Sequence, residues 1–134
     1  MILPNGAIVA VIDGERMQLF RNSGREPHVD LIGLPEPDLG KGNTGSGARH
    51  RSSSANPDSR RLREDDFAAA AAGYLNRGAL GGEIEQLVIV ADPRTLGELR
   101  KHFHDVLASK LIGQLPKTLT GRSSEAIRNA IAEA

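Results

Sequence analysis

Residues 86–101 read Gln-Leu-Val-Ile-Val-Ala-Asp-Pro-Arg-Thr-Leu-Gly-Glu-Leu-Arg-Lys, and this stretch decides the fold because it joins a buried strand to a helix. The run Leu87–Ala91 is short, apolar and rich in β-branched residues, which is typical of a strand covered on both faces. Asp92 and Pro93 end that strand. Thr95 and Glu98 have the spacing of a capping box, in which each side chain satisfies a backbone N–H of the first helical turn. We therefore expect a helix that begins after Thr95 and packs its apolar face into the core.

The residues upstream of this stretch predict an antiparallel meander. The apolar run Ile8–Ile12 is followed by Asp13 and Gly14, a strong two-residue hairpin signal, and Met17–Phe20 resumes the strand pattern. A second turn, rich in Asn, Ser and Gly, leads to a third short strand at Val29–Ile32. Three strands joined by short turns are expected to pair with one another in order.

The residues between and after these strands predict helices. The acids of residues 64–66 are expected to begin an Ala-rich helix that ends near Arg77, because they suit the positive end of the helix dipole. Leu111–Leu115 is a last strand, and Ser123 can cap a final helix. The order β-β-β-α-β-α-β-α predicts an α/β fold, with a mixed sheet, an N-terminal antiparallel meander and helices packed on its faces. At 134 residues the chain is expected to be one domain, residues 1–134.

From residue 35 to residue 63 the composition changes to Gly, Ser, Asn, Pro and Arg, with few apolar side chains to stabilise an ordered backbone. We predict a long flexible basic loop here, within the single domain. Residues 40–45 match G-x-G-x-x-G, but no strand leads into them and no helix begins at their end, so a dinucleotide site is not predicted. A solvated linker is the simpler interpretation of this composition. The alternative is a partner-binding loop whose contacts are Arg49, Arg51, Arg60, Arg61 and Arg63.

The overall composition excludes several classes of function. Seventeen basic residues balance seventeen acidic ones, so only local charge can favour a nucleic-acid partner. The chain has no Cys, which excludes disulfides, thiolate catalysis and Cys-ligated metals. No secretory signal and no run of about 18 apolar residues is present, so we expect a cytoplasmic protein without membrane insertion.

Three carboxylates suggest one catalytic alternative. A sheet of the ribonuclease H type could bring Asp13, Asp66 and Asp92 together around magnesium for phosphodiester cleavage. Each acid also has a local structural explanation, in the hairpin turn, at the helix start and at the strand end. His102 and His104 are two residues apart and would point to different sides of a continuous helix. We therefore predict no catalytic residues, no metal ligands and no cofactor.

Two segments resemble a known family. The pattern Val-x-x-Pro-Arg-Thr-Leu-Gly-Glu-Leu-Arg, from residue 90 to residue 100, and the pattern Val-x-Asp-Gly-x-x-x-x-Leu-Phe, from residue 11 to residue 20, are similar to those of the bacterial host-attachment protein family. This resemblance implies a protein required for attachment to host cells. The residues that carry it form the family signature of this chain: Asp13, Gly14, Pro93, Arg94, Thr95, Leu96, Gly97, Glu98, Leu99 and Arg100.

The order of elements also resembles the central domain of eukaryotic and archaeal peptide-chain release factors, to which the host-attachment family looks distantly related. In that domain a catalytic Gly-Gly-Gln tip lies in the long loop between the meander and the first long helix. The equivalent segment here is residues 35–63, and it contains no glutamine. The resemblance therefore argues against hydrolysis by the Gly-Gly-Gln mechanism and leaves docking to tRNA or the ribosome open.

These observations lead to three functional hypotheses. The first is a non-enzymatic cytoplasmic protein of the host-attachment family that binds an unknown protein partner through the basic loop. The second is a translation-associated protein that binds RNA, tRNA or the ribosome and lacks the Gly-Gly-Gln tip. The third is a magnesium-dependent nuclease. The sequence leaves the partner and the oligomeric state open.

Overall fold

Five strands form one mixed sheet in the computed structural model, which describes residues 1–39 and 57–134 of the chain. They lie in the order β3-β2-β1-β4-β5. Strands β1, β2 and β3 form the antiparallel meander, whereas β4 runs parallel to β1 and β5 runs parallel to β4. Their bounds are Ile8–Ile12, Met17–Asn22, Leu31–Gly33, Leu87–Ala91 and Leu111–Pro116, in chain order.

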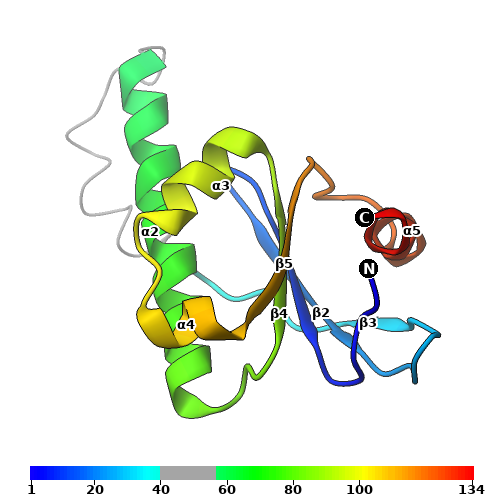
Figure 1. Cartoon of the computed structure of the whole chain (residues 1–134). Helices are drawn as coiled ribbons and strands as arrows, with labels where there is room; N and C mark the ends of the chain where they lie inside the picture. Colours follow the sequence, from blue (N-terminus) through cyan, green and yellow to red (C-terminus); the bar gives the residue numbers. More distant parts are fainter. Residues whose placement is uncertain (40–56) are drawn as a thin grey trace.

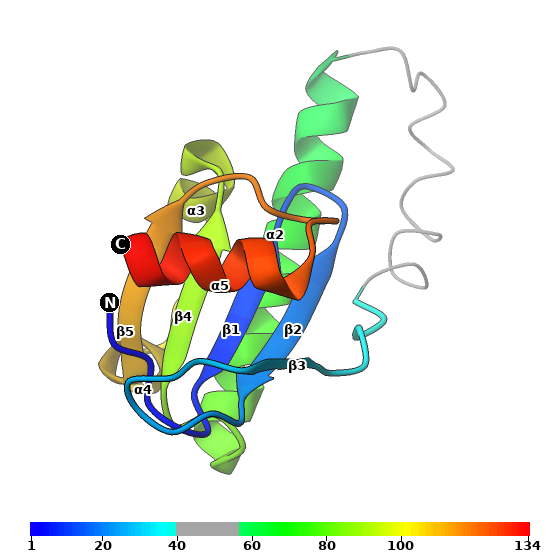
Figure 2. The same ribbon diagram turned by 90° about the vertical axis from the view of Figure 1, so that its right-hand side faces the viewer.

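Helices cover both faces of the sheet. Helices α2 (Pro57–Gly81), α3 (Pro93–Arg100) and α4 (Asp105–Lys110) lie on one face, and α5 (Ser124–Glu133) lies on the other (Figures 1 and 2). Helix α2 approaches the sheet closely because its buried face is mostly small: Ala68, Ala71, Ala72, Leu75 and Ala79. The expected α/β architecture is confirmed.

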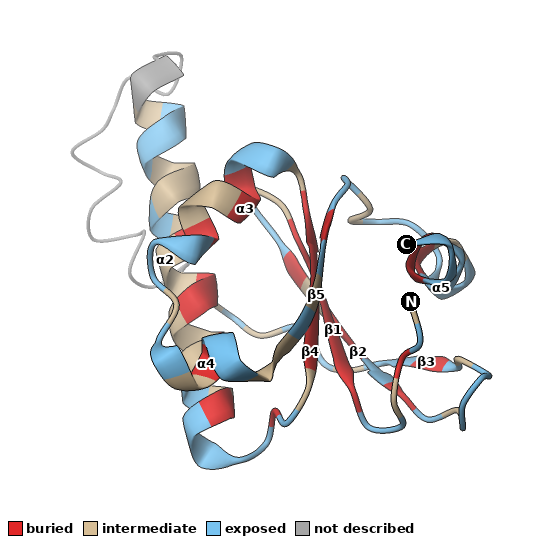
Figure 3. Cartoon of the chain, viewed as in Figure 1, coloured by how far each residue is buried: buried red, intermediate tan, exposed pale blue. Residues whose placement is uncertain are grey.

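The strand sequences explain why two cores form. Along β1, Ile8, Ala10 and Ile12 belong to the core under α2, α3 and α4, whereas Val9 and Val11 belong to the core under α5. Side chains alternate between the faces of a strand, so a strand buried on both faces needs an uninterrupted apolar run. Figure 3 shows this burial in the central strands and on the helix faces that meet them.

The boundaries of the predicted meander differ in detail. The first turn contains four residues, 13–16, because Ile12 pairs with Met17. Gly14 has no positive φ, so this is not the two-residue turn that the sequence signal favoured. The Asp13 carboxylate closes it by accepting hydrogen bonds from the backbone N–H groups of Glu15 and Arg16, both at 2.7 Å.

The predicted start of the long helix was wrong. Helix α2 begins at Pro57, so the acids of residues 64–66 lie in its third turn and not at the positive end of its dipole. The last part of the predicted loop 35–63 is therefore helical, and Arg60, Arg61 and Arg63 are helix residues. The rest of the predicted loop from residue 40 to residue 56, with Arg49 and Arg51, lies outside the described residues.

The predicted capping box was also wrong. Asp92 is the N-cap of α3, with Pro93 in the first helical position, and Thr95 lies within the first turn. Glu98 instead pairs with Lys101 at 3.1 Å, and that hydrogen bond is the main cause of a lowered Glu98 pKa. The helix ends at Arg100, and α4 follows as a separate helix.

Candidate partner-binding site

The parallel strands β1 and β4 end side by side. Ile12 pairs with Ala91, so Asp13 and Asp92 both follow directly at the same edge of the sheet. Strand β5 ends at this edge too, since Ala91 also pairs with Pro116. The carboxyl edge of parallel strands is where α/β folds commonly bind ligands, which makes the side chains gathered here the first candidates for function.

Asp13 ties the first turn to the loop before α5. Its Oδ2 accepts a hydrogen bond of 2.7 Å from the Thr120 hydroxyl, and the nearby Gly121 N–H donates to Gln18 Oε1 at 2.9 Å. Partial burial raises the pKa of Asp13, but the hydrogen bonds from Thr120 and from the backbone outweigh it, and the net pKa is lowered. Asp13 is therefore a charged acceptor with hydrogen bonds already made to both of its oxygens.

Asp92 is also engaged, in capping α3. Its Oδ2 accepts from the Thr95 N–H at 3.1 Å and its Oδ1 accepts from the Thr95 hydroxyl at 2.7 Å. The carboxylate thus occupies the positive end of the helix, where an anionic ligand would otherwise bind. We do not assign a phosphate site to this helix end.

Arg94 connects this edge to α2. Its Nη2 lies 2.8 Å from Asp65 Oδ1 and its Nη1 lies 3.3 Å from Glu64 Oε1. A Cβ on Gly14 would lie 2.7 Å from Glu64 Oε2, so Gly14 leaves the room that the Glu64 side chain fills. Two signature segments that are far apart in the sequence, one with Gly14 and one with Arg94, therefore meet the same acid of α2.

Sequence reasoning missed this meeting point. Arg94 was identified only as family signature, Gly14 as signature and hairpin turn, and their shared partner Glu64 was interpreted as a helix start. The pair Arg94–Glu64 is separated by 30 residues, and no helical or strand period links such positions. The only available signal was that both signature segments flank the ends of predicted strands.

Three further signature residues contribute to packing or to contacts between elements. Leu96 and Leu99 are buried in the core, and the Arg100 Nε donates to Gln114 Oε1 on β5 at 2.8 Å. Gly97 has open space where a Cβ would lie, so the structure gives no steric reason for glycine there.

The start of α2 extends beyond the end of the sheet (Figures 1 and 2). Arg60 and Arg61 are exposed there and Arg63 is partly exposed, and no ion pair holds any of the three within residues 1–39 and 57–134. Leu62, between them, is 50% exposed. These turns therefore present positive charge and one apolar side chain away from the core.

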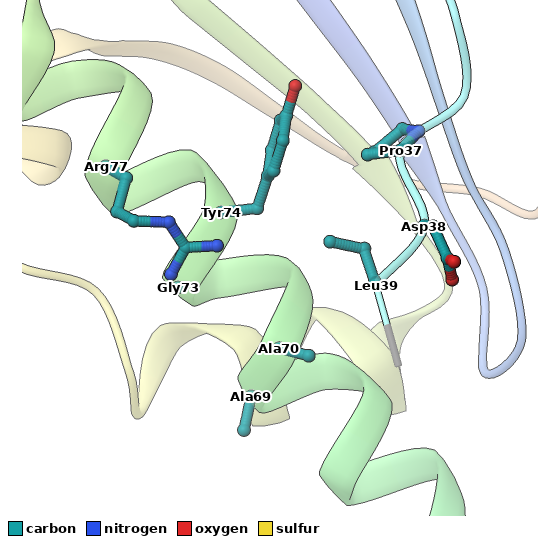
Figure 4. A pocket seen from close by; sticks show the side chains of 8 residues that line it. All are labelled: Pro37, Asp38, Leu39, Ala69, Ala70, Gly73, Tyr74 and Arg77. Carbon is teal, nitrogen blue, oxygen red and sulfur yellow. The ribbon is translucent and has the colours of Figure 1, made fainter. Parts of the chain in front are cut away.

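A shallow hollow of about 380 Å³ lies between α2 and the segment 37–39 (Figure 4). In Figure 4 the Tyr74 ring stands between the helix and that segment. Leu39 is the last residue described before residue 57, so part of the surroundings lies outside the described chain and we assign no ligand here. The lining residues are Pro37, Asp38, Leu39, Ala69, Ala70, Gly73, Tyr74 and Arg77.

The carboxylate cluster of the nuclease alternative is not assembled in the part of the chain that the structure describes. Within it, no three side chains of His, Asp or Glu are placed to hold a metal ion. Asp13 and Asp92 make the hydrogen bonds given above, and Asp66 is a mid-helix residue of α2. His104 caps α4 by accepting from the Val106 N–H, and His102 lies 3.5 Å from Glu98. No described helix is long and apolar enough to cross a membrane.

Comparison with known proteins adds one finding. Residues 6–131 match the sequence model of a family described as bacterial archaeo-eukaryotic release factor family 12. No curated protein matches the chain. The match confirms the predicted relation to release factors at the level of the family, whereas the resemblance to host-attachment proteins stays a prediction.

Proposed function

The chain belongs to bacterial archaeo-eukaryotic release factor family 12, and from this membership we propose that it is a translation-associated protein that binds RNA on the ribosome or tRNA. Its contact surface is the projecting start of α2, together with the preceding basic segment. The binding is non-enzymatic and takes place in the cytoplasm, where ribosomes and tRNA are found.

One observation carries this proposal: Arg60, Arg61 and Arg63 lie on helical turns that extend beyond the sheet. In the release-factor domain that the chain resembles, the catalytic tip lies in the segment before the equivalent helix, which supports a contact surface at this end of α2. Guanidinium groups bind phosphate through paired hydrogen bonds, and phosphate contacts supply a large share of the affinity of proteins for nucleic acids. The chain as a whole has no net charge, so its attraction for RNA must come from a local group of this kind.

The proposal excludes the release-factor reaction for a chemical reason. Residues 35–63 contain no glutamine, so the group that coordinates the attacking water in release factors is missing from the equivalent segment. A role in attachment to host cells names a phenotype, and no contact among the described residues argues for a particular route to it. That role stays a prediction, as a downstream consequence of altered translation.

Sedimentation of the tagged protein through a sucrose gradient of bacterial lysate, at low and at high salt, tests the proposal. The informative variant replaces Arg60, Arg61 and Arg63 with Gln, a good helix former that removes the charge and keeps the helix. The matched control replaces three other exposed arginines with Gln: Arg21, Arg25 and Arg122.

We expect the wild type and the control to comigrate with ribosomes at low salt and to leave these fractions at high salt. The α2 variant is expected to remain at the top of the gradient in both conditions. A wild-type protein that stays at the top at low salt and that also fails to bind purified tRNA would remove the proposal. Equal loss in variant and control would show that net charge matters and that this surface does not.

A further inference from the structure

The start of α2 carries three arginines and then three acids, in the order Arg60-Arg61-Leu62-Arg63-Glu64-Asp65-Asp66. Residues four apart on a helix are neighbours, so Arg60 could pair with Glu64, and Arg61 with Asp65. Such pairs would cancel the charge on which phosphate binding depends. The structure has neither pair.

The side chains of Glu64 and Asp65 pair with Arg94 instead. One guanidinium group spans Glu64 and Asp65, with the distances of 3.3 and 2.8 Å given above. The carboxylates are one-third exposed, at 31% and 35% of their side-chain area, so water weakens each pair without removing it. Gly14 leaves space for the Glu64 side chain on the side of the sheet edge. Two features outside α2 thus draw its acids away from the arginines of the preceding turn.

We propose that Arg94 is a positioning residue for RNA binding: it holds Glu64 and Asp65 at the sheet edge, which leaves Arg60 and Arg61 available to phosphate. This inference rests on the proposed function and adds a residue that does not itself touch RNA. It also gives Arg94 and Gly14, which lie about 80 positions apart in the sequence, one common role.

Three variants test this inference. Arg94→Met keeps an unbranched side chain and removes the charge. A triple variant adds Glu64→Gln and Asp65→Asn, which removes the acids that Arg94 holds. A charge-matched control adds Glu83→Gln and Glu85→Gln to Arg94→Met; these exposed acids follow the far end of α2. Affinity is measured for purified ribosomes and for a fluorescent single-stranded RNA oligonucleotide, and the unfolding midpoint is measured for every variant.

We expect Arg94→Met to weaken RNA binding about 5- to 10-fold, because the arginines are then partly neutralised by their own helix. The triple variant should bind within about twofold of the wild type, and the charge-matched control should stay weak. A purely structural role of Arg94 would not be rescued by removing two further side chains. The unfolding midpoint should change little throughout, since exposed ion pairs add little stability.

Three results would overturn the inference. If Arg94→Met binds as tightly as the wild type, the acids do not compete with RNA. If the triple variant is as weak as Arg94→Met, then Arg94 contacts RNA itself or only supports the fold. If the charge-matched control recovers the same RNA affinity as the triple variant, net charge alone explains the effect. A wild-type protein that binds neither probe removes the proposed function together with this inference, whereas the other three results leave the proposed function intact.

Discussion

Asp13 shows how one signature residue links segments from opposite ends of the chain. Its carboxylate closes the β1–β2 turn and also receives the Thr120 hydroxyl, from 107 residues away. Hydrogen bonds to a charged acceptor are stronger than those between neutral groups, and these bonds favour the ionised form. The pKa of Asp13 is lowered because these hydrogen bonds stabilise its charged form.

The pH dependence of stability follows from the sign of that shift. In the unfolded chain Asp13 titrates near 3.8, and in the folded chain it titrates lower. Its contribution is therefore complete above about pH 4 and is lost as the pH falls through the folded pKa. We expect Asp13→Ala to lower the free energy of unfolding by about 1–2 kcal/mol at pH 7, measured by urea denaturation. The gap between variant and wild type should narrow in acid, below the unfolded pKa.

The control for this prediction is Glu15→Ala. Glu15 is exposed and contributes its backbone N–H to the turn, so its replacement should change the stability by less than about 0.5 kcal/mol at either pH. A gap between Asp13→Ala and wild type that stays constant from neutral to acid pH would show that the carboxylate charge is not what stabilises the turn.

At the scale of a single element, the start of α3 is compatible in sequence with two caps, one at Asp92 and one at Thr95 with Glu98. The structure has the cap at Asp92. Asp92 accepts the Thr95 N–H and caps the helix, whereas Glu98 points to Lys101. We expect Asp92→Ala to cost about 1 kcal/mol of unfolding free energy, because it leaves a backbone donor of the first turn without its acceptor. Glu98→Gln should cost less than Asp92→Ala, since it leaves the cap intact and weakens only the contacts of the Glu98 side chain with Lys101 and His102.

Urea denaturation of the two variants, with Ser123→Ala at the cap of α5 as a reference for normal capping, gives the comparison. Ser123→Ala should resemble Asp92→Ala, because both residues accept a hydrogen bond from the third residue along. A larger loss for Glu98→Gln than for Asp92→Ala would favour the capping box at Thr95 after all.

Some boundaries of the helices and strands can be predicted from sequence patterns, and others cannot. The strand Leu87–Ala91 and the cap at Ser123 were predicted correctly, because an uninterrupted apolar run and a Ser before a helix have strong local causes. The start of α2 was missed because the serines and arginines around Pro57 suggested a loop. Proline is also favoured in the first turn of a helix, and that is its position here. The contacts of Arg94 with α2 depend on packing between elements, which no local pattern encodes.

For the molecule as a whole, the sheet acts as a base from which one helix projects. Helices α2, α3 and α4 share one core with the sheet, and the buried part of α2 runs from about Ala68 to Ala79. The earlier turns of α2 are outside that core, which explains how they can carry exposed arginines at little cost in stability. Removing those charges should therefore affect binding and leave folding unchanged.

The salt dependence of binding tests this separation quantitatively. Each phosphate contact on single-stranded RNA contributes about −0.7 to the slope of log K against log salt concentration, because it releases a condensed counterion. If Arg60, Arg61 and Arg63 each contact a phosphate, their replacement by Gln should make the slope less steep by about 2. Fluorescence anisotropy of labelled RNA over a salt series gives the slope, and thermal unfolding should show the same midpoint as for the wild type. An unchanged slope with weaker binding would mean that the three arginines act without contacting phosphate.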